Sequence, residues 1–354
     1  MTGRKSTSFW RRMVAAAAIV VAVSASPAYA REEIGQHRAG SDNDEQSARP
    51  FTVGVIGDMP YVQQQFDAFQ SFMNAMSADS TFDLIIHLGD IKGGSTACTD
   101  AYIKGIRDAL NSYVGALVYT PGDNEWTDCH RNAADPRNPV ERLHFVRSKF
   151  FFNPGLTLGL TPRGVYTQGS LTAFVENQAW VESKTVLAVV NIPGSNNDLD
   201  PWTHAVGTPA EQQQEFDTRL AADLDWLDAV FELARARHAR AVVIGIQADM
   251  WDPAAGAAEL TGYDRIIQRL AALALQFGKP VLLLNGDSHD FKVDNPLASG
   301  DPAHGVTTPV PNLTRITVQG GSAHFPLEYL RLTIDPRQSR APFSWQRVTP
   351  TLAP

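Results

Sequence analysis

The chain has 354 residues, of which 44% are hydrophobic and 19% are charged, and its formal net charge is −8. This length and apolar fraction are enough to fill one sizeable core. The acidic balance argues against a protein that binds nucleic acid or anionic lipid, because both partners favour a basic surface.

The N-terminus has the three parts of a secretory signal peptide. Basic residues precede an apolar run from residue 13 to 23, and Ala28-Tyr29-Ala30 follows as a small-x-small cleavage site. A membrane-spanning helix needs about 20 apolar residues, and this run is shorter. No other apolar run of the chain reaches that length. We therefore expect cleavage near Ala30, export to the periplasm or the extracellular space, and no membrane span. Because residues 1–30 hold four basic and no acidic residues, their removal leaves 26 basic against 38 acidic residues, a net charge of −12.

Three further segments follow the predicted cleavage site. Residues 31–50 are polar and show no hydrophobic period, which is typical of a flexible leader. The C-terminal tail of residues 336–354 is rich in proline and is predicted to be similarly loose. Residues 51–335 are predicted to form one α/β domain, because strand patterns alternate with helix patterns along them.

Four apolar runs, rich in Val, Ile and Leu, each end in Gly-Asp. Near-continuous apolar runs of this length are typical of strands that are buried on both faces. A glycine before each aspartate lets the backbone turn sharply and approach a ligand. The runs are residues 51–56 before Gly57-Asp58, residues 82–88 before Gly89-Asp90, residues 116–121 before Gly122-Asp123, and residues 280–285 before Gly286-Asp287.

Between these runs, apolar residues recur three and four positions apart, which is the period of an amphipathic helix that covers a sheet. The helix that begins at Thr208 has a capping box and a proline at its first position. Two apolar stretches within residues 172–192 predict a pair of strands in a second sheet, and residues 313–318 and 329–334 predict a hairpin on the same side. The predicted helices span residues 62–76, 103–113, 208–237 and 266–277, and residues 241–246 form a further strand.

The two cysteines of the chain, Cys98 and Cys129, both lie in the part that is predicted to be exported. Each follows the end of a predicted strand, where loops are neighbours. In an oxidising compartment we therefore expect them to form a disulfide.

The carboxyl ends of the strands are expected to hold a cation site. In alternating α/β folds, loops from several strands meet outside these ends and bind ligands there. Asp58, Asp90, Asp123 and Asp287 would gather in one pocket, where their charges repel one another unless divalent metal ions lie among them. His289 stands two residues after Asp287, and a carboxylate and an imidazole at one strand end together favour metal ligation.

This ordered set resembles the calcineurin-like metallophosphoesterases over nearly all of residues 51–290. The pattern of that family is Asp-x-His, Gly-Asp, Gly-Asn-His-Glu, a lone His and Gly-His-x-His. The resemblance implies a β-sandwich of two sheets flanked by helices, a four-layer α/β/β/α fold. It also implies two divalent metal ions that share one aspartate, and hydrolysis of phosphate esters by a metal-bound hydroxide.

By this resemblance, Asp58 matches the metal ligand after the first strand, and Asp90 matches the aspartate that bridges the two metal ions. Gln247 falls where the family has its lone histidine ligand. In the last motif, Asp287 takes the place of the first imidazole ligand and His289 keeps the second.

Residues 121–125 resemble the Gly-Asn-His-Glu block, so Asp123 stands at the ligand asparagine and Asn124 at the catalytic histidine. A shift by one residue instead makes Asn124 the ligand and places the next glutamate in the catalytic position, and both alternatives stay open. His130 is the nearest side chain that can replace the missing acid. Arg131 is the candidate phosphate clamp, because a guanidinium donates two parallel hydrogen bonds to phosphate oxygens.

The departures from the family pattern change the expected metal. Pro60 takes the place of the histidine in the first motif, and Gln247 and Asp287 replace two further imidazoles. Oxygen-rich ligand sets suit Mg²⁺, Mn²⁺ or Ca²⁺ better than Zn²⁺. We therefore expect one or two divalent ions of the first three kinds, while iron stays open.

The favoured function is an exported phosphoesterase that hydrolyses phosphate mono- or diesters with a metal-activated water. The alternative is a degenerate member of the same fold that binds a phosphorylated or anionic ligand without turnover, since Asn124 replaces the catalytic histidine. In the first case the partner is a phosphate-ester small molecule or macromolecule, and the chain is expected to be a monomer. The sequence leaves the substrate open, because many phosphate esters present the same group to such a site.

Overall fold

The computed structural model describes residues 48–169, 173–321 and 326–352. The predicted signal peptide of residues 1–30 and the leader up to residue 47 lie outside the described residues, so both stay predictions. Within the described ranges, no helix combines the length and the apolar character that crossing a bilayer requires.

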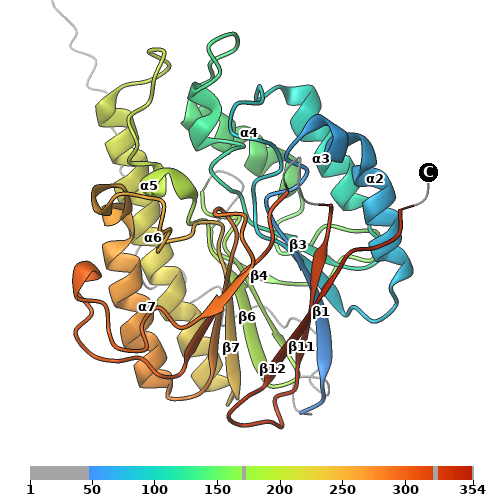
Figure 1. The fold of residues 1–354 in the computed structure, drawn as a ribbon, viewed down its shortest axis with the longest axis vertical. Coiled ribbons are helices and arrows are strands. Elements are labelled where there is room, and N and C mark those ends of the chain that lie inside the picture. The colour runs from blue at the N-terminus through green and yellow to red at the C-terminus, as the bar shows by residue number, and fades with distance from the viewer. Residues whose placement is uncertain (1–47, 170–172, 322–325, 353–354) are drawn as a thin grey trace, which may run out of the picture.

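Two β-sheets stack face to face, and helices cover the outer face of each sheet (Figure 1). The first sheet has five strands in the order β12-β11-β1-β2-β3, with β1, β2 and β3 parallel to one another and β11 antiparallel to β1. Its strands are β1 Phe51–Ile56, β2 Leu84–His87, β3 Leu117–Tyr119, β11 Tyr329–Ile334 and β12 Phe343–Val348.

The second sheet has seven strands in the order β4-β5-β6-β7-β8-β10-β9. Strands β6, β7, β8 and β10 are parallel, while β5 pairs antiparallel with β6 and β9 pairs antiparallel with β10. The strands are β4 Tyr166–Thr167, β5 Gln178–Glu182, β6 Thr185–Val189, β7 Ala241–Gly245, β8 Val281–Asn285, β9 Lys292–Asp294 and β10 Leu313–Thr317.

Helices α2, α3 and α4 pack on the five-stranded sheet, and α6 and α7 pack on the seven-stranded sheet. Of the capping box that the sequence predicts, the N-cap half is present, since the side chain of Thr208 accepts a hydrogen bond from the backbone N–H of Glu211. The carboxylate of Glu211 accepts a hydrogen bond from Nδ2 of Asn138. The helices are α2 Gln63–Ala78, α3 Asp100–Asn111, α4 Pro139–Phe150, α5 Gly194–Asp198, α6 Pro209–Ala236 and α7 Asp264–Phe277, with 3-10 helices η1 Thr127–His130, η2 Ala257–Tyr263 and η3 Pro302–His304.

The apolar runs of the sequence are strands that are buried on both faces. In β8, Leu282 and Leu284 pack into the core between the two sheets, while Val281 and Leu283 pack against the helices outside. A strand in such a position has no face for polar residues, because its side chains alternate between two cores. The four-layer α/β/β/α sandwich is therefore confirmed.

The predicted hairpin of residues 313–318 and 329–334 is wrong. Strand β10 lies in the seven-stranded sheet beside β8, whereas β11 lies in the five-stranded sheet beside β1. Both segments have the alternation of a strand, but alternation alone does not tell which strand is the partner. The two strands therefore belong to different sheets of the sandwich.

The tail from residue 336 is not loose throughout, because residues 343–348 form β12. This strand pairs antiparallel with β11 over six residues, from Phe343 opposite Ile334 to Val348 opposite Tyr329. It is the outer strand of its sheet, and most of its side chains are exposed. Its exposed polar residues hide the strand pattern that a buried strand would show.

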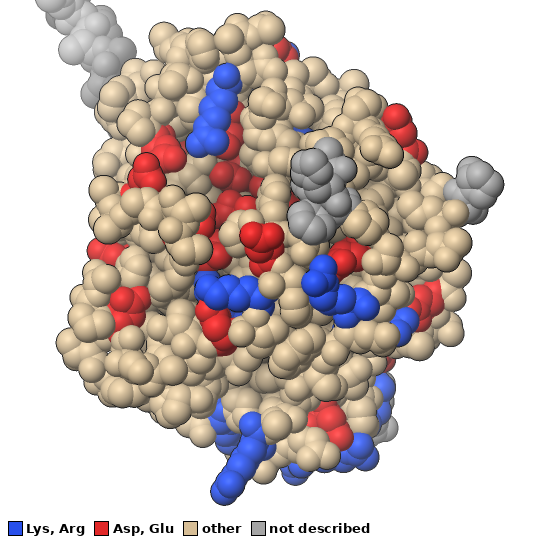
Figure 2. All heavy atoms as spheres, viewed as in Figure 1, with Lys and Arg blue, Asp and Glu red and all other residues tan. Residues whose placement is uncertain are grey.

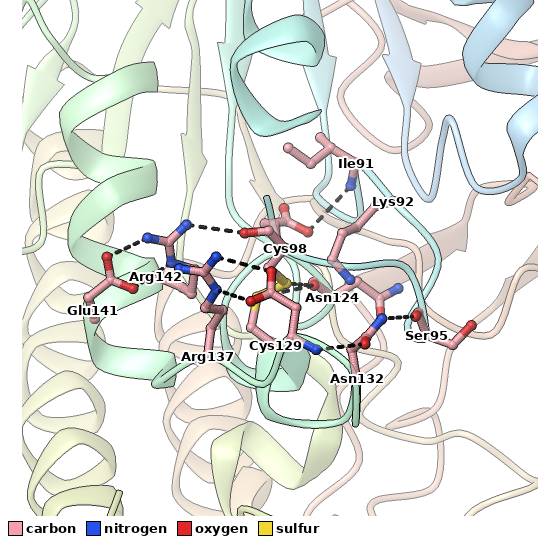
Figure 3. Close-up of a disulfide and its surroundings, with 12 residues drawn as sticks. Ile91, Lys92, Ser95, Cys98, Asn124, Cys129, Asn132, Arg137, Glu141 and Arg142 are labelled. Atoms are coloured by element: carbon pink, nitrogen blue, oxygen red, sulfur yellow. Dashed lines mark hydrogen bonds and ion pairs between the residues drawn. A yellow bond between two sulfur atoms is a disulfide. The ribbon is translucent and has the colours of Figure 1, made fainter. Parts of the chain in front are cut away.

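The predicted disulfide joins Cys98 and Cys129, whose Cα atoms are 5.6 Å apart. It links the loop after β2 to η1 after β3, two segments that are 31 residues apart in the chain. Figure 3 shows the bridge beside Asn124, whose backbone oxygen lies 3.6 Å from Sγ of Cys98 and 3.8 Å from Sγ of Cys129. Both sulfur atoms of the bridge thus contact the backbone of Asn124, a residue of the predicted site.

Replacing both cysteines by alanine should lower the free energy of unfolding by roughly 2–4 kcal/mol, because the open chain gains the entropy of a 31-residue loop. Denaturant unfolding of the variant and the oxidised wild type measures the difference. As a control, a reducing agent should destabilise the wild type and leave the variant unchanged. Equal stability of the two oxidised proteins would contradict this expectation.

Candidate metal centre

The four aspartates of the Gly-Asp pairs meet at one end of the sandwich, although they come from both sheets. Asp58, Asp90 and Asp123 follow β1, β2 and β3, and Asp287 follows β8. Ligand atoms within 4.8 Å of one another form two sets, one of Asp58, Asp90 and His289 and the other of Asp90, Asp123 and Asp287. In Figure 2, acidic side chains gather in a hollow on this face, in the upper half of the view. Asp90 belongs to both sets, as expected of a residue that bridges two ions.

The backbone is left-handed at most of these positions. The φ angles are 52° at Asp58, 57° at Asp90, 73° at Asp287 and 64° at His289. Residues other than glycine rarely adopt this conformation, and where they do, they cluster at functional sites. After β1, β2 and β8, the sharp turn is therefore made by the candidate ligand residue itself.

The glycines before the aspartates differ in why a side chain would not fit there. Gly89, with a φ of 88°, is the one among the four that needs the freedom of glycine in its backbone. A Cβ atom on Gly122 would lie 2.1 Å from Oδ1 of Asp90, and one on Gly286 would lie 2.1 Å from Oδ2 of Asp58. At these two positions, a carboxylate that follows another strand fills the space that a side chain would need, from the adjacent strand at Gly122 and from the other sheet at Gly286.

Asp58 is fully buried, and its two oxygens differ in their partners. Oδ1 accepts a hydrogen bond of 2.8 Å from the backbone N–H of Asp287 and lies 3.6 Å from Nε2 of His289. Among the described residues, Oδ2 has no hydrogen-bond partner. Burying a charged oxygen without a partner is costly, so this atom fits a site that is completed by a cation.

In the described part of the chain, the central carboxylates raise one another's pKa and have no directly paired lysine or arginine. Burial, followed by the nearby charges of Asp123 and Asp58, raises the pKa of Asp90 and of Asp287 well above the usual range. Burial also raises the pKa of Asp58, although a backbone N–H opposes this. Within the described ranges, no lysine or arginine forms an ion pair with any of the four aspartates. Divalent cations would supply the missing positive charge.

Two flanking carboxylates, in contrast, each have an arginine. Asp249 pairs with the buried Arg315, and Asp128 pairs with Arg131. Asp249 also receives a hydrogen bond from the hydroxyl of Ser288, and its backbone N–H donates to Asp287. These carboxylates are neutralised by the protein, which separates them from the four that a metal ion would hold.

Two predicted site residues turn amide nitrogens toward the carboxylates. Nδ2 of Asn124 donates to Oδ2 of Asp90 at 2.5 Å, and the backbone N–H of Asn124 donates to Oδ1 at 3.1 Å. Nε2 of Gln247 lies 3.1 Å from Asp287 and 3.3 Å from Asp123, while its Oε1 accepts from the backbone N–H of Gly194. An amide nitrogen has no lone pair for a metal ion, so in this orientation both side chains fix ligand carboxylates. The ligand role of Gln247 and the catalytic role of Asn124 stay predictions.

The imidazole of His289 packs against Tyr61, a residue to which the sequence gave no role. The ring of Tyr61 packs edge-on against the imidazole, with 4.4 Å between ring centroids. Burial lowers the pKa of His289, which favours the neutral imidazole that a metal ion requires. The hydroxyl of Tyr61 also accepts a hydrogen bond of 3.4 Å from Asn124. Tyr61 directly follows Pro60, which stands where the first family motif has histidine. This position next to the motif is the sequence feature that could have pointed to Tyr61.

Arg131 lies at the rim of the site, and its side chain is 42% exposed. One of its nitrogens pairs with Asp128, and the other donates to Oγ of Ser195 at 3.0 Å. The same hydroxyl lies 2.7 Å from Oδ2 of Asp123, so a single atom connects Arg131 to the ligand set. Ser195 belongs to a segment that sequence reasoning left without a role, and no motif pointed to it.

His130, the predicted replacement for the catalytic acid, contacts another segment of the chain. Its Nδ1 accepts from the backbone N–H of Thr203 at 3.0 Å and lies 2.9 Å from the hydroxyl of the same residue. Burial, with the charges of Arg131 and His204, lowers the pKa of His130 to about 4. Its imidazole is therefore neutral at pH 7, and a neutral imidazole is a poor proton donor.

Two further buried residues lie near the site: Glu125, which takes the catalytic position if the motif is shifted by one residue, and Lys92, which was not predicted to have a role. Glu125 accepts hydrogen bonds from the hydroxyl of Tyr119 at 2.6 Å and from the backbone N–H of Gly122 at 2.7 Å. Lys92 is fully buried two residues after Asp90, and burial lowers the pKa of its ammonium group. Glu125 fixes the turn that carries Asp123, and Nζ of Lys92 donates a hydrogen bond of 3.0 Å to the backbone oxygen of Gly93.

The chain belongs to the calcineurin-like phosphoesterases, because the model of that family matches residues 51–291, more than half of the chain. No curated protein matches the chain. Among solved structures, it is similar to GAP50, the anchor in the inner membrane complex of Plasmodium, with 9% identity and a TM-score of 0.45 over 86% of this chain and 90% of that one. It is also similar to a 5'-nucleotidase precursor from Thermus thermophilus, with 12% identity and a TM-score of 0.37 over 85% of this chain and 55% of that one.

Mn²⁺ should raise the unfolding temperature of the chelator-treated protein by on the order of 5 °C, because an ion that binds only the folded state stabilises it. Asp90→Asn should remove most of this rise, since Asp90 belongs to both ligand sets. Asp228→Asn, which changes an aspartate paired with Arg269 on the helices, is the matched control. Thermal unfolding with and without Mn²⁺ measures the rise, and an equal rise in both variants would contradict the metal centre.

Proposed function

We propose that the protein is an exported, metal-dependent phosphoesterase that hydrolyses phosphate mono- or diesters. The observation that supports this most is the pair of ligand sets that share Asp90 at the strand ends of a calcineurin-like phosphoesterase fold. Two divalent ions would nearly balance the four aspartates in charge. Because the sets contain one imidazole among carboxylates, Mg²⁺, Mn²⁺ or Ca²⁺ suits them better than Zn²⁺.

Divalent cations at such a site lower the pKa of a water molecule and stabilise the charge that develops on a phosphoryl group. The residues of the chain hold and orient the components. Asp58 and His289 would hold one ion and Asp123 and Asp287 the other, with Asp90 between them. Backbone turns, amide hydrogen bonds and the room left by the missing side chains of Gly122 and Gly286 fix these carboxylates before a substrate arrives. This avoids reorganisation during the reaction.

Arg131 is our candidate for binding the phosphate group. Its guanidinium is partly exposed at the rim, and the hydroxyl of Ser195 connects it to Asp123. A guanidinium that is already oriented by Asp128 can donate to phosphate oxygens with little loss of side-chain freedom. This arrangement supports a substrate whose phosphate lies between Arg131 and the two ligand sets.

The second candidate function is binding of a phosphorylated or anionic ligand without turnover. It is favoured by the absence of a proton donor at the position of the catalytic histidine, since Asn124 donates to Asp90 and has no proton to release at neutral pH.

The proposed export also explains the disulfide, which is stable in an oxidising compartment.

Turnover should depend on metal and on Asp90. Protein stripped with chelator is given Mg²⁺, Mn²⁺, Ca²⁺ or Zn²⁺ singly, and hydrolysis of p-nitrophenyl phosphate and bis-p-nitrophenyl phosphate is measured. We expect kcat/KM to fall by more than about 100-fold in Asp90→Asn, because the shared ligand of both ions is lost. The Asp228→Asn control should retain the wild-type value. Metal binding without hydrolysis of either ester would select the binding protein instead.

The proton donor can be tested through pH. If His130 donates the proton, kcat/KM falls about tenfold per pH unit above its pKa of about 4, because the protonated form is then lost. We expect His130→Gln to keep the wild-type pH profile between about pH 5 and 8, since the neutral imidazole is bound to Thr203. A profile that changes shape in this variant would instead make His130 the acid.

A further inference from the structure

The segment after β6 forms an unusual turn at the edge of the metal centre. In α5, the φ and ψ angles are 53° and 45° at Ser195, 54° and 40° at Asn196, and 59° and 42° at Asn197, and Asp198 follows with a φ of 67°. Four consecutive residues other than glycine are thus left-handed. Such a turn persists only where surrounding contacts over-determine it.

Buried groups hold the far end of this turn. Arg219, on α6 and 1% exposed, donates to the side-chain oxygen of Asn197 and to its backbone oxygen at 2.9 Å. The backbone N–H of Asn197 donates to the hydroxyl of Tyr263 at 3.0 Å. Asp198 accepts from the indole N–H of Trp202 at 2.9 Å. Contacts from several elements therefore fix the conformation.

The near end of the turn reaches the ligands of one set. A Cβ atom on Gly194 would lie 2.6 Å from Oδ2 of Asp123 and 2.9 Å from Oδ1 of Asp287, so the backbone is in close contact with both carboxylates. The hydroxyl of Ser195 lies 2.7 Å from Oδ2 of Asp123 and 2.7 Å from Oδ1 of Asp128. The turn thus contacts the ligand set of Asp90, Asp123 and Asp287.

The other set has different supports. Asp58 is held by the backbone N–H of Asp287, and His289 packs against Tyr61. In the part of the chain that the structure describes, no hydrogen bond joins the turn to Asp58 or His289. Among the described residues, the turn therefore contacts the Asp90–Asp123–Asp287 set directly and the Asp58–Asp90–His289 set only through shared residues.

We propose that Ser195 is a positioning residue for one of the two cation sites: its hydroxyl fixes the carboxylate of Asp123 and so sets the affinity of the Asp90–Asp123–Asp287 set. The Asp58–Asp90–His289 set does not depend on Ser195. This inference rests on the proposed metal centre. Groups that orient a ligand residue typically change metal affinity about 10- to 100-fold when they are removed.

Two variants separate the hydroxyl from the backbone. Ser195→Ala and Ser195→Gly both remove the hydroxyl, but glycine relieves the cost of the left-handed conformation and alanine keeps it. A role of the hydroxyl predicts the same loss of affinity in both, whereas a role of the turn's stability predicts wild-type affinity in Ser195→Ala and a change only in Ser195→Gly. Asn196→Gly is the matched control, because Asn196 is also left-handed but bonds to Gly262 and Ala258 instead of a ligand.

The test is titration of Mn²⁺ into the chelator-stripped mature protein by calorimetry, with electron paramagnetic resonance of the loaded samples. We expect two binding events in the wild type and in Asn196→Gly. In both Ser195 variants, one event should weaken about 10- to 100-fold while the other is unchanged, and the spectrum of a coupled Mn²⁺ pair should be lost at ion concentrations that fill the wild type.

Two results would overturn the inference alone. One is wild-type affinity for both ions in both Ser195 variants, and the other is a change of affinity in Ser195→Gly while Ser195→Ala keeps the wild-type value, which would assign the effect to the backbone. A wild-type protein that binds fewer than two Mn²⁺ ions would overturn the metal centre together with the inference. The failure of the inference and the failure of the proposed function are therefore distinguishable.

Discussion

The central constraint on the site is the repulsion among four carboxylates that the fold brings close together. Asp58, Asp90, Asp123 and Asp287 lie at the ends of strands from two sheets, and within the described residues none pairs with lysine or arginine. Burial strengthens this repulsion, because the low dielectric screens it less than water does. Cation binding would relieve it, so the same arrangement that costs stability in the metal-free protein provides affinity for metal.

The fold keeps this unfavourable arrangement through interactions around it. Strands buried on both faces fix the positions of the carboxyl ends, and the disulfide supports Asn124 from behind. Left-handed backbone at Asp58 and Asp90, and an absent side chain at Gly122, let two strands place oxygens in one small volume. Strain of this kind is maintained only where the surrounding structure over-determines it.

Much of this arrangement could be predicted from the sequence, because apolar runs that end in Gly-Asp report strands and their carboxyl ends directly. The disulfide is predicted from two cysteines that follow strand ends in the part expected to be exported, and the sandwich is implied by the family resemblance; both are confirmed. The sequence could not tell which strand is the partner of residues 313–318, since alternation does not specify pairing. It also held no signal for Ser195 or Arg219, because their roles depend on a left-handed turn and on contacts between segments that are distant in the chain.

A crystal of the mature protein grown with Mn²⁺ tests the central claim most directly, through anomalous scattering near the manganese absorption edge. The account predicts two peaks roughly 3.5–4 Å apart, both in contact with the carboxylate of Asp90, with His289 beside one peak and Asp287 beside the other. Peaks that avoid Asp90, or no peak at the strand ends when Mn²⁺ is bound elsewhere, would contradict it.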